Sequence, residues 1–159
     1  MQKKEQFPGV SITISTYGQA KQIEEVVQKT LNQDYAKNKI EVIVIDDGSP
    51  DNTMEILKKF GKKIKVIQTH RKGRVQALNK TIKEAKFDFI CLSAGDIFFE
   101  SDFLKTIMPY FKSEKIAFVS PFSETAGNAT VYRKKAFIEA GLFDLDFNTK
   151  GTGWRDDTD

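Results

Sequence analysis

Apolar residues in this chain follow two patterns, short buried runs and stretches with helical spacing. Residues 10–15 alternate apolar and β-branched side chains, and residues 42–45 are continuously apolar, as in strands of a sheet that is covered on both faces. Similar short runs predict strands at 64–67, 87–92, 116–119 and 130–133. Between them, apolar residues recur every three or four positions and predict helices over about 23–31, 50–60, 75–85, 101–111 and 136–140.

Strands and helices alternate regularly, and the segments between strands are long enough to be crossover helices. This order predicts an α/β fold, a Rossmann-like, doubly wound and mostly parallel sheet with flanking helices. Ser49 and Pro50 fit an N-cap followed by proline at the first helical position, and Gly61 fits the end of that helix. From about residue 125 the pattern weakens and glycines increase, which indicates a loop-rich region.

Composition narrows the class of protein. With 159 residues, 40% hydrophobic and 30% charged, the sequence is typical of one domain with a substantial core. The net charge of +3 is too small to indicate nucleic-acid binding. Cys91 is the only cysteine, which excludes an internal disulfide and favours a reducing compartment. The sequence has no secretory signal or transmembrane segment, so we expect a cytoplasmic protein.

Polar side chains follow each of the first four predicted strands. The carboxyl ends of parallel strands meet at one edge of a sheet, where ligands bind. An aromatic ring that stacks on a base, carboxylates that accept from base or ribose, and cations that meet phosphate together suit a nucleoside diphosphate. The candidates are Ser15, Thr16 and Tyr17 after the first strand; Asp46, Asp47 and Ser49 after the second; Arg71, Lys72 and Arg74 after the third; and Ser93, Gly95 and Asp96 after the fourth.

Other interpretations of these residues are open. Tyr17 also fits a loop aromatic that packs on the first helix, although less well than a base-stacking ring. The adjacent aspartates also fit helix capping, and the basic residues fit a solvated loop. Glycine-rich dinucleotide and P-loop patterns are absent, which weakens the NAD-enzyme and NTPase hypotheses. No nucleophile stands in a recognisable elbow, and His70, the only histidine, is interpreted as a surface or supporting group.

Six segments, in the right order along nearly the whole chain, resemble family 2 glycosyltransferases of the GT-A fold. One motif alone is weak, but six in register are specific. The segments are S-I-T-I-S-T-Y-G at 11–18, V-I-D-D-G-S at 44–49, Gly73 with A-L-N at 77–79, F-I-C-L-S-A-G-D at 89–96, G-L-F-D at 141–144 and W-R-D-D-T-D at 154–159.

The resemblance implies an inverting transferase that moves a sugar from a nucleotide-sugar donor, most often a UDP-sugar, to the hydroxyl of a saccharide or lipid-linked acceptor. Thr16 and Tyr17 would lie beside the base, and Asp47, or less favourably Asp46, would accept a hydrogen bond from it. The basic residues after the third strand would bind the diphosphate. Arg74 is favoured among them because it opens a helix, where anions meet free backbone N–H groups.

The fourth-strand motif departs from the family pattern. That pattern has a D-x-D pair that holds Mg²⁺ or Mn²⁺, whereas this chain has Ser93 and Gly95 at the two positions and retains only Asp96. Because Mg²⁺ often keeps several waters, one carboxylate with substrate phosphates can still hold a cation. We therefore expect a metal cofactor, held more weakly than in the family, with Ser93, Gly95 and Trp154 around the donor sugar.

Inverting transfer needs a base that deprotonates the acceptor hydroxyl. By the resemblance this base is Asp157, with Asp156 as the alternative. We expect residues 1–159 to form one GT-A domain that is truncated at its C-terminal end, with a nucleotide-binding half over 1–96 and the start of the acceptor and catalytic half over 97–159.

Three other hypotheses compete with the transferase. A nucleotide-binding fragment or degenerate module without turnover is favoured by Ser93 and Gly95. A sugar-nucleotide pyrophosphorylase would place a glycine- and arginine-rich signature after the first strand, where this chain has S-T-Y-G-Q at 15–19. A response-regulator receiver would need an aspartate after the third strand and a lysine after the fifth, and the sequence has neither.

Overall fold

The computed structural model describes residues 7–70, 74–121 and 129–145, and for Arg74 the backbone alone. Within them the strands form one six-stranded sheet in the order β3-β2-β1-β4-β6-β5. The strands are β1 (Val10–Thr16), β2 (Ile40–Asp46), β3 (Lys65–Gln68), β4 (Phe89–Ala94), β5 (Phe118–Val119) and β6 (Thr130–Arg133). The helices are α1 (Ile23–Leu31), α2 (Thr53–Lys58), α3 (Arg74–Glu84), α4 (Phe103–Ile107) and α5 (Lys134–Glu139).

The first four strands are parallel, while β6 runs antiparallel to both β4 and β5. The predicted α/β class with a mostly parallel sheet is therefore confirmed. One sheet continues across residue 96, because β6 pairs directly with β4. None of the helices that the structure describes combines the length and the hydrophobicity needed to cross a lipid bilayer.

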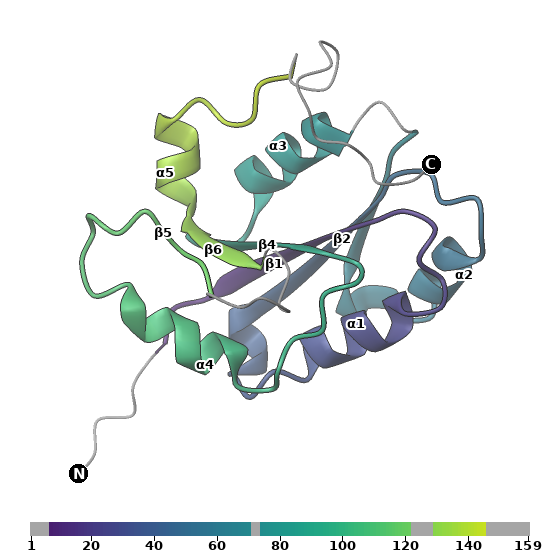
Figure 1. Cartoon of the computed structure of the whole chain (residues 1–159), viewed down its shortest axis with the longest axis horizontal. Coiled ribbons are helices and arrows are strands. Elements are labelled where there is room, and N and C mark those ends of the chain that lie inside the picture. Colours follow the sequence, from purple (N-terminus) through teal and green to yellow (C-terminus); the bar gives the residue numbers. More distant parts are fainter. Residues whose placement is uncertain (1–6, 71–73, 122–128, 146–159) are drawn as a thin grey trace.

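Helices cover both faces of the sheet, with α1, α2 and α4 on one side and α3 and α5 on the other (Figure 1). The side chains of β1 are buried along its whole length, as the alternating run in the sequence predicts for a central strand. The larger core lies under α1, α2 and α4 and includes Ile12, Ile14, Val44, Cys91 and Leu104. The smaller core lies under α3 and α5 and is built on Ile82 and Ile90.

Several predicted boundaries are wrong, most clearly at α2. Ser49 is not its N-cap, because α2 begins at Thr53 and the Ser49 hydroxyl is engaged with the loop before it. The helix also ends at Lys58, and Gly61, with φ of 54°, opens a separate 3₁₀ turn.

The helix predicted over 101–111 is shorter in the structure. Helix α4 covers Phe103–Ile107 and continues as a 3₁₀ turn over Met108–Tyr110, where Pro109 has no backbone N–H to donate. The strand predicted over 116–119 is limited to Phe118–Val119, the edge of the sheet.

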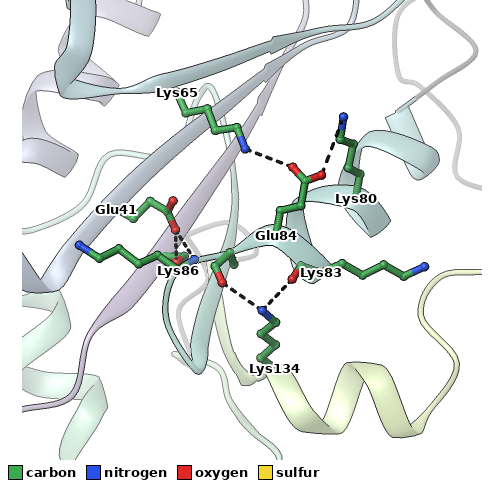
Figure 2. A network of polar contacts seen from close by, with 9 residues as sticks. Glu41, Lys65, Lys80, Lys83, Glu84, Lys86 and Lys134 are labelled. Carbon is green, nitrogen blue, oxygen red and sulfur yellow. Dashed lines mark hydrogen bonds and ion pairs between the residues drawn. The ribbon is translucent and has the colours of Figure 1, made fainter.

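A network of charged residues lies at the amino-terminal ends of β2 and β3 (Figure 2). Glu84 pairs with Lys65 at 3.3 Å and with Lys80 at 3.9 Å. The Lys86 backbone N–H donates to the Glu41 carboxylate at 2.8 Å. These side chains are largely exposed, so each ion pair contributes little to stability. The network lies at the opposite edge of the sheet from Asp46, and it fastens α3 to the strands.

Lys134 secures the end of α3 in the same network (Figure 2). Its Nζ donates to the backbone carbonyls of Lys83 at 2.8 Å and Ala85 at 3.0 Å. The last carbonyls of a helix have no partner inside the helix and carry a partial negative charge. A lysine from the start of α5 therefore satisfies the C-terminus of α3 and joins the two helices that cover this face.

Tyr35 makes the stability of the fold depend on pH in the alkaline range. Its hydroxyl donates to the Pro8 carbonyl at 2.5 Å, its ring stacks on Phe7, and burial raises the pKa of Tyr35 to about 12. In the unfolded chain a tyrosine titrates near its ordinary value of about 10, so the unfolded state loses its proton first as the pH rises. The free energy of unfolding should therefore decrease between pH 10 and 12. Tyr35→Phe should make this decrease shallower in denaturant titrations, and equal slopes for both proteins would contradict it.

Candidate functional site

Polar residues from four parallel strands meet at the carboxyl edge of the sheet. Thr16 is in register with Asp46, Asp46 with Gln68, and Ser15 with Ala94. The three backbone bonds that follow extend these ladders past the strands, from Asp47 N to Thr16 O at 3.0 Å, from Thr69 N to Asp46 O at 2.8 Å and from Gly95 N to Ser15 O at 2.8 Å. The predicted candidates after β1, β2 and β4 therefore lie side by side.

The order of the strands fixes the spacing of these candidates. Strand β1 lies between β2 and β4, so Tyr17 follows the central strand, with Asp47 on one side and Asp96 on the other. Neighbouring strands are about 4.8 Å apart, which places the ends of β2 and β4 roughly 10 Å from each other. A ring and two carboxylates are thus spread along one edge of the sheet.

Asp46 is buried and holds two loops together. Its side chain is 0% exposed and accepts a hydrogen bond from the Ser49 hydroxyl, whose oxygen in turn accepts the Gly18 N–H at 2.9 Å. Gly18 has φ of 62°, a conformation that glycine adopts without strain. Asp46 and Ser49, both predicted to contact the nucleotide, form this link between the loops that follow β1 and β2.

A second link between the same loops comes from Asp51. Its carboxylate accepts the Ala20 N–H at 3.1 Å, and it also accepts the Thr53 N–H at 3.1 Å and the Thr53 hydroxyl at 2.6 Å. The pKa of Asp51 is lowered from its ordinary value, chiefly by the hydrogen bond from the Thr53 hydroxyl. Burial, the next cause in size, raises it, and backbone N–H groups, including those of Ala20 and Thr53, lower it further. The sequence analysis missed this residue, although an aspartate two positions before a threonine at a helix start is typical of such a turn.

Asp47 differs from its neighbour because it is half-buried, and among the described residues its carboxylate accepts a hydrogen bond from the Thr69 hydroxyl. Tyr17 is also half-buried. Thr69, which the sequence analysis did not single out, follows β3 directly and so reaches the carboxylate that follows β2. Of the two adjacent aspartates, Asp47 is the one with carboxylate surface at the edge.

The end of β4 offers one carboxylate. Asp96 is exposed in a turn closed by the Ile97 N–H and the Ala94 carbonyl at 3.2 Å. Gly95 is buried, and the Ser93 hydroxyl is buried without a hydrogen-bond partner among the described residues. In the part of the chain that the structure describes, no three His, Cys, Asp or Glu side chains gather as metal ligands.

Asn79 joins helix α3 to the turn that follows α5, two segments that are far apart in the sequence. Its side-chain amide donates to the Phe143 carbonyl at 2.8 Å, and its oxygen accepts the Phe143 N–H at 3.0 Å. This pairing fixes the turn after α5, where Gly141 and Leu142 both have positive φ and their N–H groups donate back to Ile138 and Phe137. Asn79 therefore has a structural role.

Replacing Asn79 tests this pairing. Asn79→Ala should lower the free energy of unfolding by about 1 kcal/mol, because two hydrogen bonds to one backbone residue are lost. Chemical denaturation measures the change, and Gln76→Ala, an exposed position on the same helix, is the matched control. A loss no larger than that of the control would contradict the structural role.

Six predicted site residues are not placed. Arg74 opens α3, but its side chain is not described. The other five lie outside the described residues: Arg71, Lys72, Trp154, Asp156 and Asp157. Their assignment to the diphosphate, the donor sugar and the catalytic base stays a prediction.

Comparison with known proteins identifies the family. Residues 11–158 match the family described as Glycosyl transferase family 2, so this chain belongs to the family 2 glycosyltransferases. It is 34% identical over 101 residues to the dolichyl N-acetyl-alpha-D-glucosaminyl phosphate 3-beta-D-2,3-diacetamido-2,3-dideoxy-beta-D-glucuronosyltransferase of Methanococcus voltae, a match over 60% of this chain and 32% of the relative. It is 26% identical over 137 residues to the poly-beta-1,6-N-acetyl-D-glucosamine synthase of Staphylococcus aureus, over 84% of this chain and 32% of the relative.

Solved structures confirm the GT-A fold. The mannosyltransferase PcManGT from Pyrobaculum calidifontis, in complex with GDP-Man and Mn²⁺, is similar with a TM-score of 0.81 at 20% identity, over 89% of this chain and 49% of that one. S. aureus TarS 1–349 in complex with UDP is similar with a TM-score of 0.73 at 21% identity, over 89% and 52%. The chain thus spans about a third of the curated relatives and about half of the solved chains.

Proposed function

We propose that this chain is the donor-binding part of an inverting glycosyltransferase that takes a sugar from a UDP-sugar and transfers it to an acceptor hydroxyl. The observation that carries the proposal is the convergence of Tyr17, Asp47 and Asp96 after three adjacent parallel strands. The family supports sugar transfer as the reaction, and the structures of TarS with UDP and with UDP-GlcNAc support the choice of nucleotide.

The base and the ribose would bind between the ends of β1 and β2. Tyr17 supplies an aromatic face for the base, beside the Thr16 backbone. Asp47 supplies a carboxylate that accepts from N–H or hydroxyl groups, with the Thr69 hydroxyl donating to it and orienting it. Asp46 and Ser49 would support this position indirectly, since they hold the two loops at a fixed separation.

A divalent cation fits the residues present only in a limited way. An all-protein cage is not available among the described residues, because Asp96 stands alone after β4 and the Ser93 hydroxyl is buried. Mg²⁺ and Mn²⁺ favour oxygen ligands, and Mg²⁺ keeps several waters beside one or two carboxylates and substrate phosphates. Asp96 would hold such a cation together with the diphosphate, and the cation when bound would offset the charge of the leaving group.

Transfer with inversion requires a base on the acceptor side. We assign this base to Asp157, or to Asp156 in its place, and we take the acceptor to be a saccharide or a lipid-linked sugar. The support is the late W-R-D-D-T-D segment, in the order that the family motifs follow. A carboxylate that accepts the acceptor proton while the diphosphate leaves from the opposite face accounts for inversion.

Ligand-dependent melting tests the donor. Melting temperature is measured with UDP, GDP, UDP-sugars and GDP-mannose, each with Mn²⁺ or Mg²⁺. At one hundred times its dissociation constant a ligand adds about 2.7 kcal/mol to stability, which corresponds to roughly 5–10 °C for a chain of this size. We expect UDP and UDP-sugars to give such a shift. No shift with any nucleotide or nucleotide sugar would remove the proposal.

A nucleotide-binding module without turnover is the second candidate, favoured by Gly95 and by the buried Ser93 hydroxyl. It predicts the same melting shifts but no release of nucleoside diphosphate from a UDP-sugar. Release measured with the wild-type chain and abolished in Asp157→Asn would eliminate this candidate. Binding without release, in the presence of a range of saccharide acceptors, would favour it.

A further inference from the structure

Position 95 has no room for a side chain. A Cβ built on Gly95 would lie 2.1 Å from Gln19 Oε1, 2.8 Å from Thr16 Oγ1 and 2.9 Å from Thr16 Cβ, and Cβ atoms do not approach other heavy atoms this closely. Gly95 is absent from the glycines with positive φ, so space rather than backbone conformation accounts for it. Thr16 is 4% exposed. A side chain at residue 95 would therefore require the side chains of both Gln19 and buried Thr16 to move.

The group that fills this space is the carboxamide of Gln19. Thr16 Oγ1 donates to Gln19 Oε1 at 2.8 Å, which holds the amide against the end of β4. The Gln19 backbone carbonyl accepts the N–H groups of Gln22 and Ile23 and so starts α1, which fixes the residue from its main chain as well. Nε2 and Oε1 of Gln19 are bonded to the same carbon atom, so the N–H donors also lie near Gly95.

The side-chain N–H groups of Gln19 have no hydrogen-bond acceptor among the described residues. Nε2 is also absent from the set of buried polar atoms without a partner, which contains the hydroxyls of Thr13, Thr81 and Ser93. Gln19 follows the turn at Gly18 and is half-buried at the carboxyl edge of the sheet. An amide that is anchored through its oxygen and has N–H donors without a partner among the described residues is suited to an anionic oxygen.

We propose that Gln19 donates a hydrogen bond to the diphosphate of the bound nucleotide, in the space where a carboxylate at residue 95 would otherwise face a metal ion. This inference rests on the proposed function. Replacing an anionic group by a neutral donor removes one repulsion from the diphosphate, so the nucleotide depends less on a cation for binding. Gln19 thus sets the metal dependence of donor binding in this chain.

Titration calorimetry with UDP, in EDTA and in Mn²⁺, tests this on the chain as it is. The wild-type affinity in EDTA should be within about fivefold of that in Mn²⁺. Gln19→Ala should weaken UDP about tenfold in both buffers, the effect of losing one hydrogen bond to a charged group. Gln19→Glu, which keeps the acceptor for Thr16, should weaken UDP a further tenfold in EDTA and recover most of this in Mn²⁺.

The matched control is Gln28→Glu, the same charge change at an exposed position of α1. It should leave both affinities unchanged, and melting temperatures without ligand check that all variants are folded. UDP binding that needs Mn²⁺ in the wild type, or Gln19 variants that bind as the wild type does, would overturn the inference and leave the proposed function intact. No binding of UDP in either buffer would overturn both.

Discussion

Asp46→Ala should lower the free energy of unfolding by about 2–3 kcal/mol, although the residue contacts no ligand in the proposed site. The Asp46 carboxylate is fully buried and accepts a hydrogen bond from the Ser49 hydroxyl. The oxygen of this hydroxyl accepts a hydrogen bond from the Gly18 N–H. Without the carboxylate, the Ser49 hydroxyl loses this acceptor, and the link from Gly18 through Ser49 is no longer anchored at the end of β2. Urea denaturation measures the loss, and an unchanged midpoint would contradict the supporting role.

Asp47→Ala should have the opposite effect, a small change in stability and a large decrease in affinity for UDP. The Asp47 side chain is half-buried and accepts one hydrogen bond from Thr69, so its removal should change stability by less than about 1 kcal/mol. If its carboxylate accepts from the base or the ribose, the affinity for UDP should decrease at least about tenfold, the effect of one charge-assisted hydrogen bond.

Asp88→Ala is the matched control for both aspartates. Its side chain is exposed and lies just before β4, at the opposite edge of the sheet. We expect little change in stability and none in affinity for UDP. A pair of variants at 46 and 47 that lose stability and affinity in the same proportion would contradict the division of roles between the two neighbours.

Gln33→Leu should have the second large effect. It should lower the free energy of unfolding by about 2–3 kcal/mol and the melting temperature by roughly 5–10 °C. Gln33 is 1% exposed, and both ends of its amide are used: Nε2 donates to the Glu100 carbonyl at 2.6 Å and Oε1 accepts the Leu104 N–H at 3.2 Å. Leucine has a similar size and makes neither bond, so two buried backbone groups lose their partners.

The same substitution has a consequence for the site. Gln33, which follows α1, binds Glu100 in the segment between β4 and α4 and Leu104 in α4, and Asp96 is the second residue of that segment. Affinity for UDP should therefore decrease several-fold in Gln33→Leu, together with the stability. Gln28→Leu, at an exposed position of α1, is the matched control and should change neither. A stable Gln33→Leu protein would show that the two hydrogen bonds are replaceable.

The sequence predicted the elements that depend on local pattern. Helix α1 was found because Ile23, Val26, Val27 and Thr30 recur on one face, and all four are buried. The four parallel strands were found because strands covered on both faces are short apolar runs. The helix at 101–111 was overestimated, because an apolar spacing does not reveal that Pro109 and a 3₁₀ turn follow a single turn and a half of α-helix.

Within the candidate site, the sequence supplied the residues but not their division of labour. Asp46 and Asp47 are adjacent and of one chemical type, yet one is enclosed between two loops and the other is at the surface. Gln19 and Gly95 carried no signal that one fills the space of the other, because they are far apart in sequence and meet only through the pairing of β1 with β4.

The sequence by itself determined the family, the class of fold and the edge of the sheet at which polar groups gather, since hydrophobic periodicity and ordered motifs are read along the chain. The tertiary structure alone decided which carboxylate is enclosed between the loops, which one reaches the surface and which side chains occupy the space beside residue 95. The physical reason is that hydrogen bonds such as Gly18 to Ser49, 31 residues apart, and steric contacts such as Thr16 with Gly95 exist only after distant strands have paired.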